Sequence, residues 1–306
     1  MKVLQLVQQA AVRLQAAGVH FGHGTTNADD EAAWLVLWRL GLPLDALDEQ
    51  ADREVTPDEE ASVDTLIDER IRSRRPAAYL TGEAWLQGVP FFVDERVIVP
   101  RSLIAEPLAE GSFDAWLGPQ TQRVLDLCTG NGSLAVLTAL AWPEVTVDAA
   151  ELSTDALAVA ARNVARHGLQ HRITLHQGDG LAAVAGRRYD LVLCNPPYVN
   201  SASMAVLPAE YRAEPELALA GGADGMDFIH RLLTALPAHL NEGGVLVLEI
   251  GHELAHFEAT FPGLPFVGLS TSAGDEQVLL ITASDLQMGL QMSPHALPAP
   301  NLNENP

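Results

Sequence analysis

Strand and helix signals alternate over most of the chain after residue 120, and this alternation constrains the fold more than any other feature. Apolar runs suited to strands cover seven segments, 123–127, 145–150, 173–176, 189–194, 245–250, 266–269 and 278–281. Helical periodicity covers the intervening segments 132–141, 154–167 and 228–240. The pattern predicts an α/β domain whose mainly parallel, seven-stranded sheet is covered by helices on both faces and closed by an antiparallel pair.

The first hundred residues show a different pattern. Apolar residues recur at helical spacing over 3–17, a second helix is expected over 29–40, and Thr56-Pro57 begins a third that runs to Ser73. Aromatic and β-branched residues then flank the turn Gln87-Gly88 between 83 and 99, which is typical of a β-hairpin.

These patterns divide the chain into four parts. We expect a helical, substrate-recognising domain over 1–82, a hairpin linker over 83–102, the α/β catalytic domain over 103–283, and a disordered tail over 284–306. The tail is rich in Gln, Pro and Asn and shows no periodicity.

Composition excludes several classes of protein. With 306 residues, 48% of them hydrophobic, the chain can bury a core, yet no run approaches the roughly 18 apolar residues of a membrane span. The amino terminus is polar where a signal peptide would be apolar, so we expect a cytoplasmic protein without membrane association. The two cysteines, Cys128 and Cys194, form neither a disulfide framework nor a zinc motif, and no metal site is expected. Because both end neighbouring strands, the two residues are expected to lie close together, reduced and buried.

The formal net charge of −22 also bears on partners. It is the opposite of the basic surface that grips phosphate backbones, so no stable direct binding of nucleic acid is expected. An acidic surface suits a basic protein partner. On charge alone, however, plain solubility is the better explanation of the acidic surface.

Acidic residues and glycines gather where three successive strands end. Asp126 lies in the first strand and is followed by Thr129-Gly130-Asn131-Gly132, Glu151 ends the second, and Asp179 follows the third. In open α/β sheets, ligands bind beyond the carboxyl ends of the strands. Glycines let the backbone approach a ligand, Glu151 is placed to accept ribose hydroxyls, and Asp179 to accept an adenine amine. The glycine pair alone is better explained by an ordinary turn, but with the acids it predicts a nucleoside site.

The fourth strand runs into Asn195-Pro196-Pro197-Tyr198. Prolines end many strands without any further role. An amide nitrogen, however, is a poor nucleophile that needs orienting, and the side-chain oxygen of Asn195 and the carbonyl of Pro196 can accept both its hydrogens. Tyr198 would supply a face for the flat group to pack on. The motif therefore indicates methylation of an NH₂ group that is held in line with a methyl donor.

Further segments of the chain also match one enzyme family, namely 75–84, 91–93, 97–101, 214–215 and 221–225. From about Val3 to Ile281 the chain resembles the N(5)-glutamine methyltransferase family of Rossmann-like enzymes. The resemblance implies S-adenosylmethionine as cofactor and S-adenosylhomocysteine as product. It implies a cofactor site of Asp126, Thr129, Gly130, Asn131, Gly132, Glu151, Asp179 and Asn195, and substrate contacts from Asn195, Pro196, Pro197, Tyr198 and Arg101. Arg101 either borders the active site or forms a structural salt bridge.

Two bacterial branches of this family differ in their targets. One modifies the Gly-Gly-Gln loop of peptide-chain release factors, usually with proline and then an acid after Pro-Arg. Here Pro100-Arg101 is followed by 102–106, Ser-Leu-Ile-Ala-Glu, which resembles the branch that modifies large-subunit ribosomal protein three, as does 21–32. The alternatives are release-factor methylation, adenine amino methylation on nucleic acid, which uses a similar motif, and a non-catalytic role on the assembling ribosome.

Overall fold

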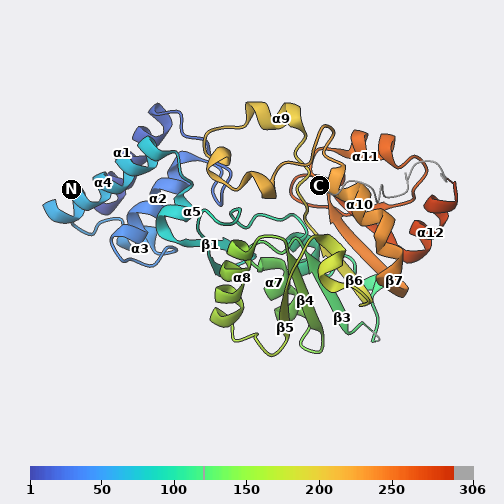
Figure 1. The fold of residues 1–306 in the computed structure, drawn as a ribbon. Helices are drawn as coiled ribbons and strands as arrows, with labels where there is room; N and C mark the ends of the chain where they lie inside the picture. The colour runs from blue at the N-terminus through green and yellow to red at the C-terminus, as the bar shows by residue number, and fades with distance from the viewer. Residues whose placement is uncertain (120, 293–306) are drawn as a thin grey trace. The chain divides into compact units, whose positions relative to one another are not determined.

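The computed structural model describes residues 1–119 and 121–292 and divides the chain into two compact units (Figure 1). The first unit comprises Met1–Arg101 together with Leu207–Pro215. The second comprises Ser102–Val206 and the chain from Glu216 onward. The polypeptide therefore passes from one unit to the other after Arg101, after Val206 and after Pro215.

Helices form most of the first unit. They are α1 (Val3–Ala16), α2 (Ala28–Arg39), α3 (Leu47–Gln50), α4 (Pro57–Ser73) and α5 (Ala77–Thr81). The α4 helix begins as predicted, with the Thr56 side chain accepting the Glu59 N–H and the Glu59 carboxylate accepting the Thr56 N–H, a reciprocal capping box. Apolar faces of α1, α2 and α4 share one core that includes Leu14, Leu35 and Ile67. The helical character predicted for this region is confirmed.

The expected hairpin follows, formed by β1 (Glu83–Leu86) and β2 (Val89–Phe92) in antiparallel register. Gln87 and Gly88 both have positive φ, 50° and 73°, which gives the strands a turn that matches their twist. The hairpin is shorter than the expected region 83–99, because the apolar run 97–99 forms no strand. Its backbone groups bond to side chains instead, with the Val97 carbonyl accepting from Tyr79 Oη and the Val99 N–H donating to Glu214 Oε1 at 2.9 Å.

A buried ion cluster fixes Leu207–Pro215 within the first unit. Its members are Glu31, Arg70, Arg74, Arg101, Glu210 and Glu214. Arg70, only 1% exposed, donates from Nε to Glu31 at 2.8 Å and from Nη1 to Glu210 at 3.4 Å. Both terminal nitrogens of Arg101 bond the Glu214 carboxylate at 2.6 Å. The segment 207–215, which the sequence placed in the catalytic domain, thus packs as part of the helical unit.

Glu214 is expected to make the first unit sensitive to acid. Burial alone would raise the pKa of its carboxyl group, but the contact with His23 Nε2 at 3.5 Å and the charge of Arg101 outweigh burial and lower the pKa to about 2. Because this lies below the ordinary value of 4.5, ionised Glu214 stabilises the fold above that pH, and the contribution is lost as pH falls toward about 2. Glu214→Gln should flatten the pH dependence of the unfolding free energy in this interval, as measured by urea unfolding across pH. An unchanged slope would contradict the account; exposed Glu49→Gln is the control.

The second unit is built on a seven-stranded sheet of order β5-β4-β3-β6-β7-β9-β8. The strands are β3 (Arg123–Leu127), β4 (Thr146–Glu151), β5 (Ile173–Gln177), β6 (Tyr189–Cys194), β7 (Leu240–Glu249), β8 (Val267–Gly268) and β9 (Val278–Thr282). All pairings are parallel except those of β9 with β7 and β8. The Rossmann-like sheet and its antiparallel closing pair are confirmed. Strand β7 begins five residues before the predicted run, because Leu240 pairs with Tyr189 across a bulge.

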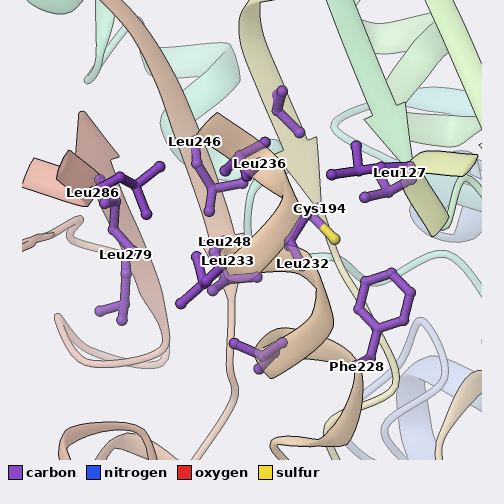
Figure 2. Packing of buried hydrophobic residues seen from close by; sticks show 14 of the residues in the cluster. Leu127, Cys194, Phe228, Leu232, Leu233, Leu236, Leu246, Leu248, Leu279 and Leu286 are labelled. Atoms are coloured by element: carbon purple, nitrogen blue, oxygen red, sulfur yellow. The ribbon is translucent and has the colours of Figure 1, made fainter. Parts of the chain in front are cut away.

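Helices cover both faces of this sheet, as the alternating side chains of its strands require. Asp126 in β3 bonds the backbone of α7 (Ser133–Ala141), which with α8 (Thr154–Arg166) contacts β3, β4 and β5. On the other face, α10 (Asp227–Ala235) and the turn that follows it pack against β7. Figure 2 shows Leu232 of α10 and Leu236 of the turn packed with Leu246 and Leu248 of β7. The shorter helices are α6 (Ala105–Glu110), α9 (Ser201–Val206) and α11 (Leu254–Thr260).

The carboxyl-terminal helix α12 (Ala283–Met292) corrects the boundary expected for the tail. The sequence predicted disorder from residue 284, but Asp285 accepts hydrogen bonds from the backbone and hydroxyl of Thr282, and Leu286 is 1% exposed in the core beside Leu279 (Figure 2). One buried leucine, Leu286, and one capping acid, Asp285, are too few to produce helical periodicity in the sequence. Residues 293–306 of the expected tail lie outside the described residues.

No helix within the described part of the chain combines the length and the hydropathy needed to cross a membrane.

Candidate active site

A loop of unusual backbone geometry follows β3. Cys128, Gly130 and Gly132 all have positive φ, at 62°, 54° and 82°. A side chain at Gly132 would place its Cβ 3.3 Å from that of Ala160 in α8, so the loop packs closely on this helix. A Cβ at Gly130 would meet no atom within 4 Å, which leaves the backbone there open to a ligand. A non-glycine residue such as Cys128 at positive φ is the kind of strain that clusters at functional sites.

Asp126 and Thr129 support this loop from beneath. Asp126 is 1% exposed, and its Oδ2 accepts the Thr129 hydroxyl and, at 2.9 Å, the N–H of Ala135. Burial raises the pKa of Asp126 to about 6, against the lowering effect of these two bonds. Asn131 is also inward, with its Oδ1 accepting from Ser133 N–H at 3.1 Å. These three predicted cofactor residues therefore shape the loop from its buried side.

Glu151 lies against the loop at the carboxyl end of β4. Its Oε2 accepts the Gly130 N–H and its Oε1 the Ser153 N–H, each at 3.0 Å. The carboxylate is only partly buried, and an ionised carboxylate has lone pairs for further donors beyond these two. The glycine loop and the second-strand acid are thus brought together, as the sequence predicted.

Asp179 follows β5, whose end is joined to the same edge by the Gly178 N–H bond to the Glu151 carbonyl at 3.0 Å. Its Oδ2 accepts from Arg231 of α10 at 2.7 Å, an ion pair in which both side chains are more than half exposed. Exposed pairs of this kind are weak, so the carboxylate can exchange this partner for another donor. Nothing in the sequence around Arg231 signalled this contact.

The motif Asn195-Pro196-Pro197-Tyr198 stands directly beside the glycine loop. Leu127 at the end of β3 is in register with Cys194 at the end of β6, so both segments leave the sheet at the same edge. Pro196 is buried, while Asn195 and Tyr198 are partly exposed. The thiols of Cys128 and Cys194 are free and in contact, and burial first, then this contact, raises the pKa of Cys194. The two cysteines therefore lie together as expected, but only Cys194 is buried, whereas Cys128 is partly exposed.

The backbone after the motif is locked in place by pairing with a second segment. Val199 donates its N–H to the Leu219 carbonyl at 2.8 Å and accepts from Gly221 at 2.9 Å. A Cβ at Gly221 would lie 2.7 Å from the Cα of Tyr198, and one at Gly225 would lie 2.2 Å from the Tyr198 carbonyl oxygen. Only glycines allow this approach, which gives a physical reason for the glycines of the segment 221–225.

Comparison with known proteins shows which family the chain belongs to. Models of the PrmC N-terminal domain and of the methyltransferase small domain match residues 5–82 and 111–209. The ribosomal protein uL3 glutamine methyltransferase of Bordetella pertussis is 57% identical over 92% of this chain and 95% of its own length. That of Burkholderia pseudomallei is 52% identical over 93% and 95%. The chain belongs to the ribosomal protein uL3 glutamine methyltransferase family.

A solved structure, a methyltransferase from Pyrococcus furiosus, shares 18% identity with a TM-score of 0.46, over 65% of this chain and 90% of its own. That likeness is too distant to bear on function. The family assignment rests on the close sequence relatives, and it makes this chain a methyltransferase, as the sequence predicted.

Arg101 is the one predicted site residue of this family member that lies in the first unit. It forms the ion pair with Glu214 described above, and its guanidinium lies over the Tyr211 ring at 5.3 Å. The salt bridge that the sequence offered as one alternative is therefore present, with a partner inside the same unit.

Sequence reasoning missed Glu249, the last residue of β7. It is 3% exposed and accepts the Tyr198 hydroxyl on Oε1 at 2.9 Å. The signal was available, because Glu249 is the lone acid in the predicted strand 245–250, just as Asp126 and Glu151 lie near the ends of β3 and β4.

Proposed function

We propose that this chain transfers a methyl group from S-adenosylmethionine to the side-chain amide nitrogen of a glutamine in large-subunit ribosomal protein uL3, releasing S-adenosylhomocysteine. The observation that carries the proposal is the position of Asn195-Pro196-Pro197-Tyr198, at the sheet edge where the glycine loop and Glu151 also lie. The close relatives are named for the same reaction and the same target protein.

The residues at the ends of β3, β4 and β5 fit the nucleoside part of the cofactor. Glu151 would accept the ribose hydroxyls, and Asp179 the exocyclic amine of adenine, in exchange for its exposed contact with Arg231. The open backbone at Gly130 would let the ligand approach closely. When bound, S-adenosylmethionine supplies an electrophilic methyl group on a sulfonium.

Asn195 and Pro196 would orient the nucleophile. The side-chain oxygen of Asn195 and the backbone carbonyl of Pro196 accept the two N–H hydrogens of the target amide, and the Tyr198 ring packs against its plane. This arrangement aims the nitrogen at the methyl group and needs no strong base, because rigid placement lowers the barrier. The proton leaves after transfer, when the acidity of the nitrogen has risen.

Replacing Glu151 tests the cofactor site. Glu151→Gln should weaken binding of S-adenosylmethionine by about ten- to a hundredfold, since a bond to a charged acceptor contributes roughly 1.5–3 kcal/mol. Calorimetric titration of the purified protein measures the change. Glu144→Gln is the matched control, because Glu144 is an exposed acid just before the amino-terminal end of β4. This variant should bind S-adenosylmethionine normally. Equal affinity in wild type and Glu151→Gln would remove Glu151 from the site.

The charge of the chain supports the class of partner. A net charge of −22 favours a basic protein over a nucleic acid, whose phosphates it would repel. We place the reaction in the cytoplasm, with the ribosomal protein as substrate and no membrane or stable nucleic-acid partner.

The direct test of the chemistry uses labelled S-adenosylmethionine with purified uL3. We expect label in the protein, and tandem mass spectrometry should place one methyl on the side-chain nitrogen of a single glutamine. A methyl on any other atom would contradict the proposal. Labelling of naked nucleic acid that falls steeply with salt would support adenine methylation instead. Cofactor binding without transfer to any substrate would support a non-catalytic role.

A further inference from the structure

Glu249 is a buried carboxylate with donors on both oxygens. It is the last residue of β7 and is 3% exposed. Its Oε1 accepts the Tyr198 hydroxyl at 2.9 Å, and its Oε2 accepts the Ser102 hydroxyl at 2.6 Å and the Leu103 N–H at 2.9 Å. Burying a charge is costly unless hydrogen bonds compensate, so these three donors together make the position tolerable.

The Tyr198 side chain is held by Glu249 at one end and by a glycine along its edge. A Cβ at Gly251, two residues after Glu249, would lie 2.5 Å from Cε2 of Tyr198 and 3.1 Å from Cδ2. The ring therefore lies directly on the backbone that leaves β7. Gly221 and Gly225 confine the backbone of Tyr198, and the hydrogen bond to Glu249 holds its hydroxyl.

The second oxygen of Glu249 ties the same point to the start of the second unit. Ser102, 6% exposed, also accepts the Ile104 N–H on its hydroxyl at 3.3 Å, which fixes the turn that leads into α6. The carboxylate thus joins three segments, at 102–104, at 198 and at the end of β7. Of these, only Tyr198 belongs to the proposed substrate site.

We infer that Glu249 is a positioning residue for methyl transfer, which sets the orientation of the Tyr198 ring while Ser102 and Leu103 hold the carboxylate itself in place. The inference rests on the proposed packing of the target amide against Tyr198. Glu249 acts on the transfer step, because its bond to the Tyr198 hydroxyl reaches the catalytic motif.

A double-mutant cycle tests this role. Glu249→Gln keeps the size of the side chain but cannot accept from all three donors, and Tyr198→Phe removes the hydroxyl while keeping the ring. Each alone should lower kcat for the protein substrate by about ten- to a hundredfold, as small misplacements in an active site do, with unchanged affinity for S-adenosylmethionine. The double variant should be no slower than the slower single variant, since both substitutions remove the same hydrogen bond between Glu249 and Tyr198.

The molecule contains a matched control pair. Tyr189, fully buried in β6, donates its hydroxyl to Asp148 of β4 at 2.8 Å, a tyrosine–carboxylate bond in the same sheet without contact to the motif. Asp148→Asn and Tyr189→Phe should lower the unfolding free energy and leave kcat close to wild type. If Glu249→Gln behaves like these two, or if its effect on kcat persists in full in Tyr198→Phe, the positioning role is wrong.

Ring orientation is measured separately, without any substrate. The chain has four tyrosines, so meta-fluorotyrosine labelling gives fluorine NMR signals that tyrosine-to-phenylalanine variants assign. Glu249→Gln should shift and broaden the Tyr198 signal, whereas Asp148→Asn should shift and broaden the Tyr189 signal.

An unmoved Tyr198 signal in Glu249→Gln overturns the inference whatever the substrate. A moved signal in a protein that does not methylate uL3 would instead leave the positioning intact and refute the proposed function. If Glu249→Gln does not fold, Glu249→Asp enters the same two measurements, because it keeps the charge but shortens the reach to Tyr198.

Discussion

Asn195→Ala should lower kcat for methylation of the protein substrate by about a hundred- to a thousandfold, because orientation of the amide is the main contribution that the chain makes to the reaction. The resemblance places Asn195 in the cofactor site as well, but its side-chain oxygen is assigned to the target NH₂ group, so the affinity for S-adenosylmethionine should stay within about twofold of wild type. Steady-state kinetics and calorimetric titration measure the two quantities on the same preparation.

Asn241→Ala is the matched control for this variant. Asn241 lies in β7 near the opposite end of the sheet, where its amide donates to Asp190 at 2.7 Å. We expect its kcat to be unchanged. A loss of cofactor affinity in Asn195→Ala as large as the loss of kcat would show that Asn195 holds the cofactor and would contradict the role given to it.

Arg70→Met should destabilise the first unit by about 3–5 kcal/mol, the cost of leaving buried charges without their partner. Arg70 is 1% exposed and neutralises Glu31 and Glu210, and it also donates to the His20 carbonyl at 3.1 Å. Chemical denaturation followed by tryptophan fluorescence measures the loss, because Trp34 and Trp38 pack against the core of this unit.

Arg13→Met provides the comparison, since Arg13 also bonds two carboxylates of the same unit, Asp64 and Asp68, but at the exposed surface. Exposed pairs of this kind contribute roughly 0–1 kcal/mol. If the two variants lose the same stability, the buried ion cluster does not hold the unit together in the way that its burial implies.

The local parts of the fold could be predicted because their signals are local. Thr56-Pro57 followed by Glu59 marks the start of α4 to the residue, and the apolar runs give β3 and β6 their bounds as observed. The run 97–99 has strand propensity but forms no strand, because a distant carboxylate, Glu214, takes the place of a partner strand.

Long-range contacts explain what the sequence did not predict. Glu210 bonds Arg70 across 140 residues of chain, and no periodicity within 207–215 indicates that this segment belongs to the helical unit. The same limit applied at the site. The acid near the end of β3 could be predicted because it precedes the glycine loop, and the acid at the end of β4 because β4 is the next strand along the chain. Glu249 ends a later strand, and its partner Tyr198 lies 51 residues away in the sequence, so no local pattern connects the two.

The central claim is that the target is a glutamine of uL3, and competition tests it most directly. Purified uL3 and purified release factors are mixed in equal amounts with a limiting quantity of the enzyme and S-adenosylmethionine, and the initial rate of methylation of each is followed by quantitative mass spectrometry. We expect uL3 to be methylated first, on the side chain of one glutamine, while the release factors stay unmodified. Preferential methylation of the Gly-Gly-Gln loop of the release factors would contradict it and would leave only the chemistry of the site in place.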